Sequence, residues 1–203
     1  EAVKRSLASS MHIILVLAFP LAFGIAAVST PFTYFFFSVK FMPVAPLMAV
    51  EAIVVIPISI ASAIGVQYLL PTDQVKSYTV SVILGSLVNI VVNVPLILWL
   101  GTMGAVIGTI LSESVVTLYQ IYSIKDQLPL TDLFSESWKY CLSALIMFLA
   151  IKGIELTWPR NMTSLILEVL FGVIDYVIAL FLLRPRILFG YIEPYIERFR
   201  HRA

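Results

Sequence analysis

Charged side chains are scarce in this 203-residue chain. Asp, Glu, Lys and Arg make up 12% of it, whereas 60% is hydrophobic and the mean hydropathy is +0.99. A water-soluble domain has roughly a quarter of its residues charged. The composition therefore excludes an ordinary soluble domain and predicts an integral membrane protein. The net charge of +1 gives no sign of a nucleic-acid partner.

Cysteine and histidine are rare as well, with one Cys and two His. Cys141 can form no disulfide within the chain and is no metal site by itself. Glycine-rich phosphate loops, HExxH spacing and a Ser-His-Asp set are all missing from the sequence. We therefore expect no cofactor, no metal and no enzymatic activity. His12 and His201 have no evident partner at this level.

What the chain does contain is a series of apolar runs. A helix needs about 20 apolar residues to cross a hydrocarbon core of about 30 Å. Six runs qualify, and the predicted spans lie near residues 9–30, 45–69, 77–99, 103–124, 138–157 and 163–183. The sequence thus predicts an all-α membrane protein, with a bundle of six transmembrane helices over residues 1–184. Residues 185–203 read as a basic amphipathic tail on the inner leaflet.

Six spans place both ends of the chain on one side, and basic residues indicate which side. With cytoplasmic ends, ten Lys and Arg lie inside and three outside. The inner set is Lys4, Arg5, Lys76, Lys125, Lys139, Arg184, Arg186, Arg198, Arg200 and Arg202, and the outer set is Lys40, Lys152 and Arg160. The positive-inside rule therefore predicts a multi-pass protein of the cell (inner) membrane, with both ends cytoplasmic.

Three local predictions concern the loops. The aromatic residues between Ser29 and Pro46 predict a separate helix in the outer interface. Thr131 or Ser135 fits the N-cap of the fifth span. Lys152 and Glu155, three residues apart, are expected to pair or to extend toward water.

The third predicted span carries a polar stripe. Ser81, Gly85, Asn89 and Asn93 follow one another at intervals of four, so they share a helix face. An unpaired amide in hydrocarbon costs several kcal/mol, so this stripe cannot face lipid. Two readings stay open, namely hydrogen bonding to a neighbouring helix or the lining of a water-filled cavity.

Acidic residues lie deep in the fourth and sixth spans. Glu113 belongs to a polar stripe with Thr109, Thr117 and Gln120, on a different face from the small residues Gly104, Gly108 and Ser112. An intramembrane carboxylate is a candidate functional residue, although a protonated acid bonded to a neighbouring helix is the alternative. Asp175, on the same face as Glu168, is open to the same two readings.

Several of these features stand in an order that resembles a known family. They are Leu69-Leu70-Pro71-Thr72, Lys76, the Gly85/Asn89/Asn93 stripe, Gly101-Thr102-Met103-Gly104-Ala105 and Ser112-Glu113. Over residues 5–125 the chain resembles the Wzx-type polysaccharide flippases of the multidrug/oligosaccharidyl-lipid/polysaccharide exporter superfamily. The motifs are individually loose, and their order carries the resemblance.

The resemblance implies the C-terminal lobe of a two-lobe exporter, whose N-terminal lobe is missing here. Such proteins flip undecaprenyl-diphosphate-linked oligosaccharides by alternating access, as ion-coupled antiporters in exopolysaccharide biosynthesis. The expected partners are a lipid-linked oligosaccharide, membrane lipids and the missing lobe. Lys76 would attract the diphosphate, Asn89 and Asn93 would bind sugar hydroxyls, and Glu113 and Asp175 would couple the ion. The family's glycine and basic residue after Pro-Thr are Asp73 and Gln74 here, which weakens a headgroup contact by that loop.

Other functions remain open at the level of sequence. A multidrug or other lipid exporter of the same superfamily would carry a similar pattern. A membrane enzyme of glycan assembly would be expected to have a large extracytoplasmic loop with catalytic residues, and the longest outer loop here, residues 29–46, is mostly aromatic. A scaffold subunit would not need polar stripes at mid-membrane.

Overall fold

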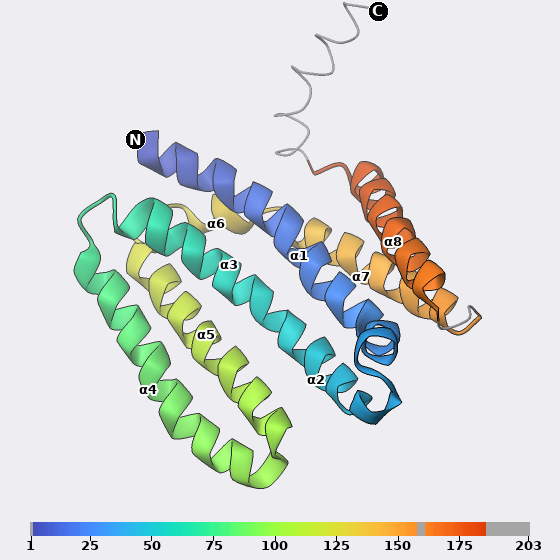
Figure 1. Cartoon of the computed structure of the whole chain (residues 1–203). Helices are drawn as coiled ribbons and strands as arrows, with labels where there is room; N and C mark the ends of the chain where they lie inside the picture. Colours follow the sequence, from blue (N-terminus) through green and yellow to red (C-terminus); the bar gives the residue numbers. More distant parts are fainter. Residues whose placement is uncertain (1, 158–160, 186–203) are drawn as a thin grey trace, which may run out of the picture.

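The computed structural model describes residues 2–157 and 161–185, and within these ranges all regular structure is helical (Figure 1). The predicted tail of residues 185–203 lies outside the described residues beyond Pro185. The long helices are α1 (Ala2–Phe37), α4 (Val75–Leu100), α5 (Thr102–Ile124), α7 (Ser137–Glu155) and α8 (Met162–Leu183). The short ones are η1 (Val39–Phe41), α2 (Val44–Glu51), η2 (Ala52–Val54), α3 (Val55–Ile64), η3 (Gly65–Leu69) and α6 (Leu130–Phe134).

The prediction of six membrane-length helices is confirmed. The candidate spans are Ser6–Phe37, Val44–Leu69, Val75–Leu100, Thr102–Ile124, Leu130–Glu155 and Met162–Leu183. Each overlaps a predicted span, and the ends differ by a few residues where helices run on beyond the apolar run. The fold class is therefore an all-α, multi-pass membrane bundle.

The second span is continuous but irregular. It joins α2, η2, α3 and η3, so a 3₁₀ turn precedes Pro57 and a π-helical turn follows Ile64. Proline has no N–H to donate to the preceding turn, which loosens the backbone there. The carbonyl of Pro57 accepts a hydrogen bond of 2.8 Å from Thr117 Oγ1 on α5. This contact ties the irregular span to the fourth one.

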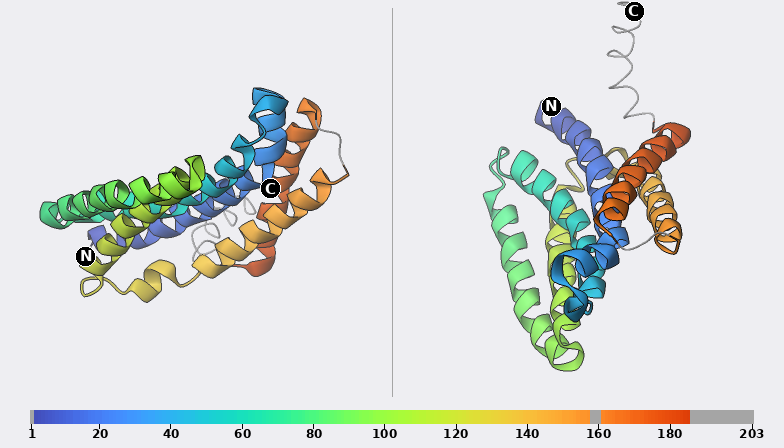
Figure 2. Two further views of the ribbon diagram at one scale, coloured as in Figure 1. Left: turned by 90° about the horizontal axis from the view of Figure 1, so that it is seen from below. Right: turned by 45° about the vertical axis from the view of Figure 1, so that its right-hand side comes forward.

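α1 lies at the centre of the bundle. The largest group of buried side chains gathers around it, including Leu7, Met11 and Leu15 from α1 and Tyr140 from α7. Figures 1 and 2 show α3, α5 and α4 on one side of α1, and α7 and α8 on the other. α4 lies at the edge, where only 11% of its membrane-length window is buried. The bundle thus offers a broad apolar flank along α4.

Two local predictions are wrong. The aromatic segment does not form a separate interfacial helix, because α1 continues through Pro31 to Phe37. Phe32 and Phe36 stack with their ring centroids 4.6 Å apart, a contact that the helical spacing of four residues allows. The fifth span is not capped by Thr131 or Ser135: Glu136 occupies the N-cap position of α7, and Thr131 lies within α6.

Two groups of polar contacts lie away from the α4–α5 side of the bundle, one within α7 and one between helices. Lys152 Nζ and Glu155 Oε2 are 2.7 Å apart, so the predicted pairing is confirmed. His12 is buried, and its Nε2 lies 2.9 Å from the carbonyl oxygen of Asp132. Because a carbonyl only accepts, Nε2 carries the proton, and Nδ1 accepts from the Tyr140 hydroxyl at 3.3 Å. The histidine without an evident partner therefore joins α1, α6 and α7.

Candidate functional site

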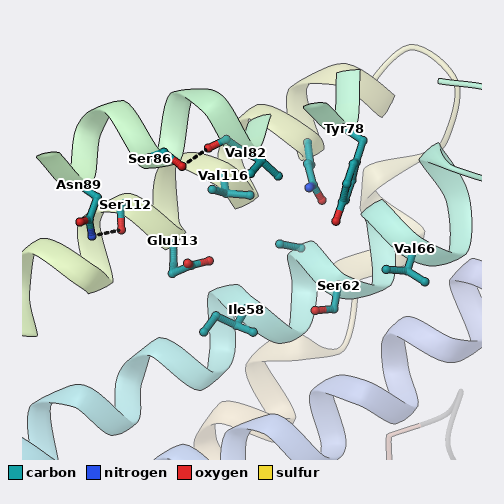
Figure 3. Close-up of a pocket in the computed structure, with 13 residues that line it drawn as sticks. Ile58, Ser62, Val66, Tyr78, Val82, Ser86, Asn89, Ser112, Glu113 and Val116 are labelled. Atoms are coloured by element: carbon teal, nitrogen blue, oxygen red, sulfur yellow. Dashed lines mark hydrogen bonds between the residues drawn. The ribbon is translucent and has the colours of Figure 1, made fainter. Parts of the chain in front are cut away.

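A polar cavity of about 350 Å³ lies among α3, α4 and α5. It opens between three membrane-length helices, and its lining mixes amide, hydroxyl and carboxyl groups with apolar side chains (Figure 3). The lining residues are Ile58, Ala61, Ser62, Val66, Tyr78, Val82, Gly85, Ser86, Asn89, Ser112, Glu113, Val116 and Gln120. Polar walls at this depth are costly in lipid, so the cavity is the candidate site.

Small residues bring α4 and α5 together beside this cavity. A Cβ on Gly85 would collide with the side chain of Val116, and one on Gly108 would collide with the amide of Asn93. Glycine at these positions lets two helices approach closely. The polar stripe of α4 therefore packs on the small-residue face of α5.

The two asparagines play different parts in this packing. Asn89 Nδ2 donates to Ser112 Oγ at 3.2 Å, and Asn93 Nδ2 donates to Asn89 Oδ1 at 2.9 Å. Asn89 lines the cavity, whereas Asn93 does not and instead packs against Gly108. Asn93 thus supports Asn89 from behind, and only Asn89 is available to a molecule in the cavity.

Glu113 extends into the space between α5 and α3. Figure 3 shows its carboxyl group on the side of the cavity that faces Ile58 and Ser62. Its side chain is half-buried and makes no hydrogen bond or ion pair within the described part of the chain. The carboxyl group is therefore free to bind a proton, a cation or a hydroxyl group.

A buried amide closes one end of the cavity. Gln120 is 1% exposed, and its Nε2 donates to Ser81 Oγ at 3.0 Å. Its Oε1 is buried without a hydrogen-bond partner among the described residues. The same amide and the ring of Tyr78 lie against Gly65 in the π-helical turn. This end of the cavity therefore contains a buried acceptor that no described donor satisfies.

The structure divides the residues predicted from the sequence. Asn89 and Glu113 line the same cavity, and Asn93 lies directly behind Asn89. Lys76 is exposed at the start of α4 and is not part of the lining. Asp175 lies on α8, which packs against α1 and α7, on the other side of the bundle. Of the five predicted residues, two therefore line the cavity and a third supports one of them. Lys76 and Asp175 lie elsewhere.

Sequence reasoning did not single out Ser62, Ser86 or Tyr78 for this site. Tyr78 stands three residues before Ser81 and extends the α4 stripe by one turn, which is a signal that the spacing contains. Ser62 shares a helix face with Ser59, but only Ser62 lines the cavity. The π-helical turn changes the direction of nearby side chains, and no pattern in the sequence reveals that turn.

The described residues bring together no group of three or more His, Cys, Asp or Glu side chains that can hold a metal ion. A second cavity, of about 590 Å³, lies between α1, α2, α3 and α7. Its lining is almost entirely apolar and includes Phe23, Leu145 and Phe148, with Lys152 as its charged residue. Such a space suits an alkyl chain rather than a sugar.

Comparison with known proteins gives one structural likeness. No family model matches the chain, and no curated protein matches it in sequence. Its structure is similar to that of the lipid II flippase MurJ in an inward closed conformation, with a TM-score of 0.75 and 21% identity. The match covers 87% of this chain and 38% of the MurJ chain. The chain thus has the fold of a part of this flippase and spans less than half of its length.

Proposed function

We propose that this chain is the C-terminal lobe of a transporter that flips an undecaprenyl-diphosphate-linked oligosaccharide across the cytoplasmic membrane. The observation that carries the proposal is the polar cavity with the unpaired carboxyl group of Glu113, set among three membrane-length helices. Support comes from the MurJ-like fold, since that protein's name states that it moves lipid II. Both chain ends lie in the cytoplasm in this proposal, as the basic residues predict.

Asn89 is the residue we assign to sugar recognition. Its amide is held in place by Ser112 and Asn93, so it is oriented before a ligand arrives. Ser62 and Ser86 add hydroxyl groups to the same walls. Amide and hydroxyl groups on one wall match the hydroxyl groups of a sugar. Asn93 acts by positioning Asn89.

We assign charged side chains to two further tasks, namely binding of the coupling ion and attraction of the diphosphate. We assign the coupling ion to Glu113, because its carboxyl group in the cavity is free of ion pairs among the described residues. Asp175 is a second candidate, at mid-membrane on α8, with a buried Oδ2 that has no hydrogen-bond partner in the described ranges. Lys76, exposed at the cytoplasmic end of α4, is placed to attract a diphosphate before it enters. The apolar cavity near Lys152 accommodates part of the lipid tail.

The test uses cells that lack the natural full-length protein. Lipid-linked repeat units should accumulate on the inner leaflet, and the wild-type gene should restore export. Asn89→Ala and Glu113→Gln should restore little export at normal protein levels. Ser114→Ala is the matched control, because Ser114 neighbours Glu113 but donates to the Ile110 carbonyl at 2.6 Å and does not line the cavity.

Two outcomes would overturn the proposal. One is full export by the double variant of Asn89 and Glu113 at normal protein levels. The other is a deletion strain that accumulates no lipid-linked precursor but becomes sensitive to drugs, which would favour a multidrug exporter of the same superfamily.

A further inference from the structure

Glu168 is a buried acid that the polar cavity does not use. It is 2% exposed, and its Oε2 has no hydrogen-bond partner among the residues that the structure describes. It lies on α8, a helix of membrane length. An ionised carboxylate in such a place costs several kcal/mol unless a positive charge neutralises it. The surroundings of Glu168 therefore decide its charge.

Two charged groups that act on Glu168 belong to the end of α7. Lys152 and Glu155 form an ion pair of 2.7 Å there, and both act electrostatically on Glu168. Gly172, one turn further along α8, fits against Ile151, which keeps the two helices close. The side chains of Lys152 and Glu155 are 33% and 12% exposed. Both members of the pair are therefore more exposed than Glu168, which is 2% exposed.

Among the described residues, a charge count leaves this cluster short of one positive charge. Lys152 supplies one positive charge, and Glu155 and Glu168 supply two negative ones when ionised. α1 also packs against α8, but its residues 13–37 include no Asp, Glu, Lys, Arg or His, and its one tyrosine there, Tyr34, is 38% exposed. The ionised cluster is therefore a net anion in an apolar setting.

We propose that Glu168 and the Lys152–Glu155 pair form a proton-binding site that exchanges with water at the membrane face where α7 ends. One proton from water binds to the carboxylate pair, and the buried cluster becomes neutral. The proton belongs to the coupled pair of acids rather than to one of them. A metal ion is a poorer occupant, since two carboxylates and a lysine make an incomplete ligand set.

Protonation of this site also affects the apolar cavity between α1, α2, α3 and α7, because Lys152 lines that cavity. When the proton leaves, Glu155 and Glu168 compete for the same ammonium group. Loss of the proton thus changes the charge at one end of that cavity. The proposal does not depend on the transport function, because protonation is measured without any substrate.

Infrared spectroscopy of the whole chain in proteoliposomes tests the site. A protonated carboxylic acid gives a carbonyl stretching band that a carboxylate lacks. The difference between wild type and Glu168→Gln should contain the band of one such acid. Asp73→Asn, in an exposed loop, is the control that should leave the band unchanged.

Glu155→Gln is the sharper variant. It leaves one lysine and one acid, so Glu168 should ionise, pair with Lys152 and lose its carbonyl band although it is still present. Lys152→Met should instead keep the band up to a higher pH. A band that persists in Glu155→Gln shows an isolated structural acid and overturns the proposal. A wild-type band that appears only when sodium is removed overturns it as well, in favour of a cation site.

Discussion

Gly108 has no side chain beyond a hydrogen atom, and this leaves room for the amide of Asn93 on the facing helix. The amide of Asn93 occupies the space that a Cβ at position 108 would need. From there its Nδ2 holds Asn89 at 2.9 Å. The orientation of the cavity amide therefore depends on a glycine on the opposite helix.

Gly108→Ala should destabilise the protein by about 1–3 kcal/mol, because the added methyl group overpacks the α4–α5 contact. Thermal unfolding in detergent measures the loss. Gly153→Ala is the matched control: its Cβ would meet nothing within 4 Å, so stability should stay level or rise by up to about 1 kcal/mol. Adding Asn93→Ala to Gly108→Ala should recover part of the loss. Equal effects of the two glycine substitutions would contradict this account.

At the scale of the elements, two glutamines join the loops at one end of the bundle. Gln74 and Gln127 exchange side-chain hydrogen bonds of 2.9 Å in both directions. Gln127 Oε1 also accepts from the Tyr68 hydroxyl at 3.0 Å. Lys4 Nζ donates to the backbone oxygen of Gln127 at 2.8 Å. This amide clasp links the beginnings of α1 and α4 with the end of α5.

Gln127→Ala should open the clasp and leave Gln74 Oε1 and the Tyr68 hydroxyl unpaired, while Gln74 Nε2 keeps its bond of 2.8 Å to Thr72 Oγ1. A lost hydrogen bond of this kind costs about 1–3 kcal/mol. A loss of about 1.4 kcal/mol raises the equilibrium constant for local opening tenfold. Backbone amides at Thr72, Asp73 and Gln74 should exchange with deuterium about tenfold faster or more. Asp126→Ala, an exposed neighbour, should leave their exchange unchanged. Unaltered exchange in Gln127→Ala would refute the clasp.

The clasp gives Gln74 a structural role in joining the loops. Sequence reasoning correctly expected the helices, because apolar length is a strong signal in lipid. It could not see the clasp, since two amides 53 residues apart leave no periodic trace. It misplaced the end of α1, because a proline inside a membrane helix is tolerated where the same residue ends a soluble one.

At the scale of the whole molecule, the cavity combines residues from three helices, and no one of these residues predicts the cavity from the sequence. Asn89 and Glu113 were visible in the sequence as costly groups in lipid. Which of them face a common space depends on how α3 packs across α4 and α5, and on the π-helical turn at Gly65–Leu69. Asn93 and Asn89 looked equivalent by spacing, yet only packing assigns one to the cavity and the other to its support.

The orientation of the bundle is testable with its single cysteine removed. In a Cys141→Ser background, Thr102→Cys in the α4–α5 turn should react with an impermeant thiol reagent applied to whole cells. Asp73→Cys, in the loop between η3 and α4, should react only after the cells are opened. Both positions are exposed in the structure, so burial does not confuse the result. Labelling of Asp73→Cys from outside would reverse the proposed topology.

The position of α4 at the edge of the bundle has a consequence for how the protein enters the membrane. Asn89 and Asn93 find their partners only in α5 and in each other within the described contacts, and most of α4 is otherwise exposed to apolar surroundings. Released alone from the ribosome-bound insertion channel, α4 would keep the bond between Asn93 and Asn89 but would present Asn89 Nδ2 to the acyl chains without its Ser112 partner. The tight turn at Gly101, with φ of 60°, delivers α5 immediately afterwards. We therefore expect the two helices to enter the bilayer as one hairpin, with the bond from Asn89 to Ser112 already formed.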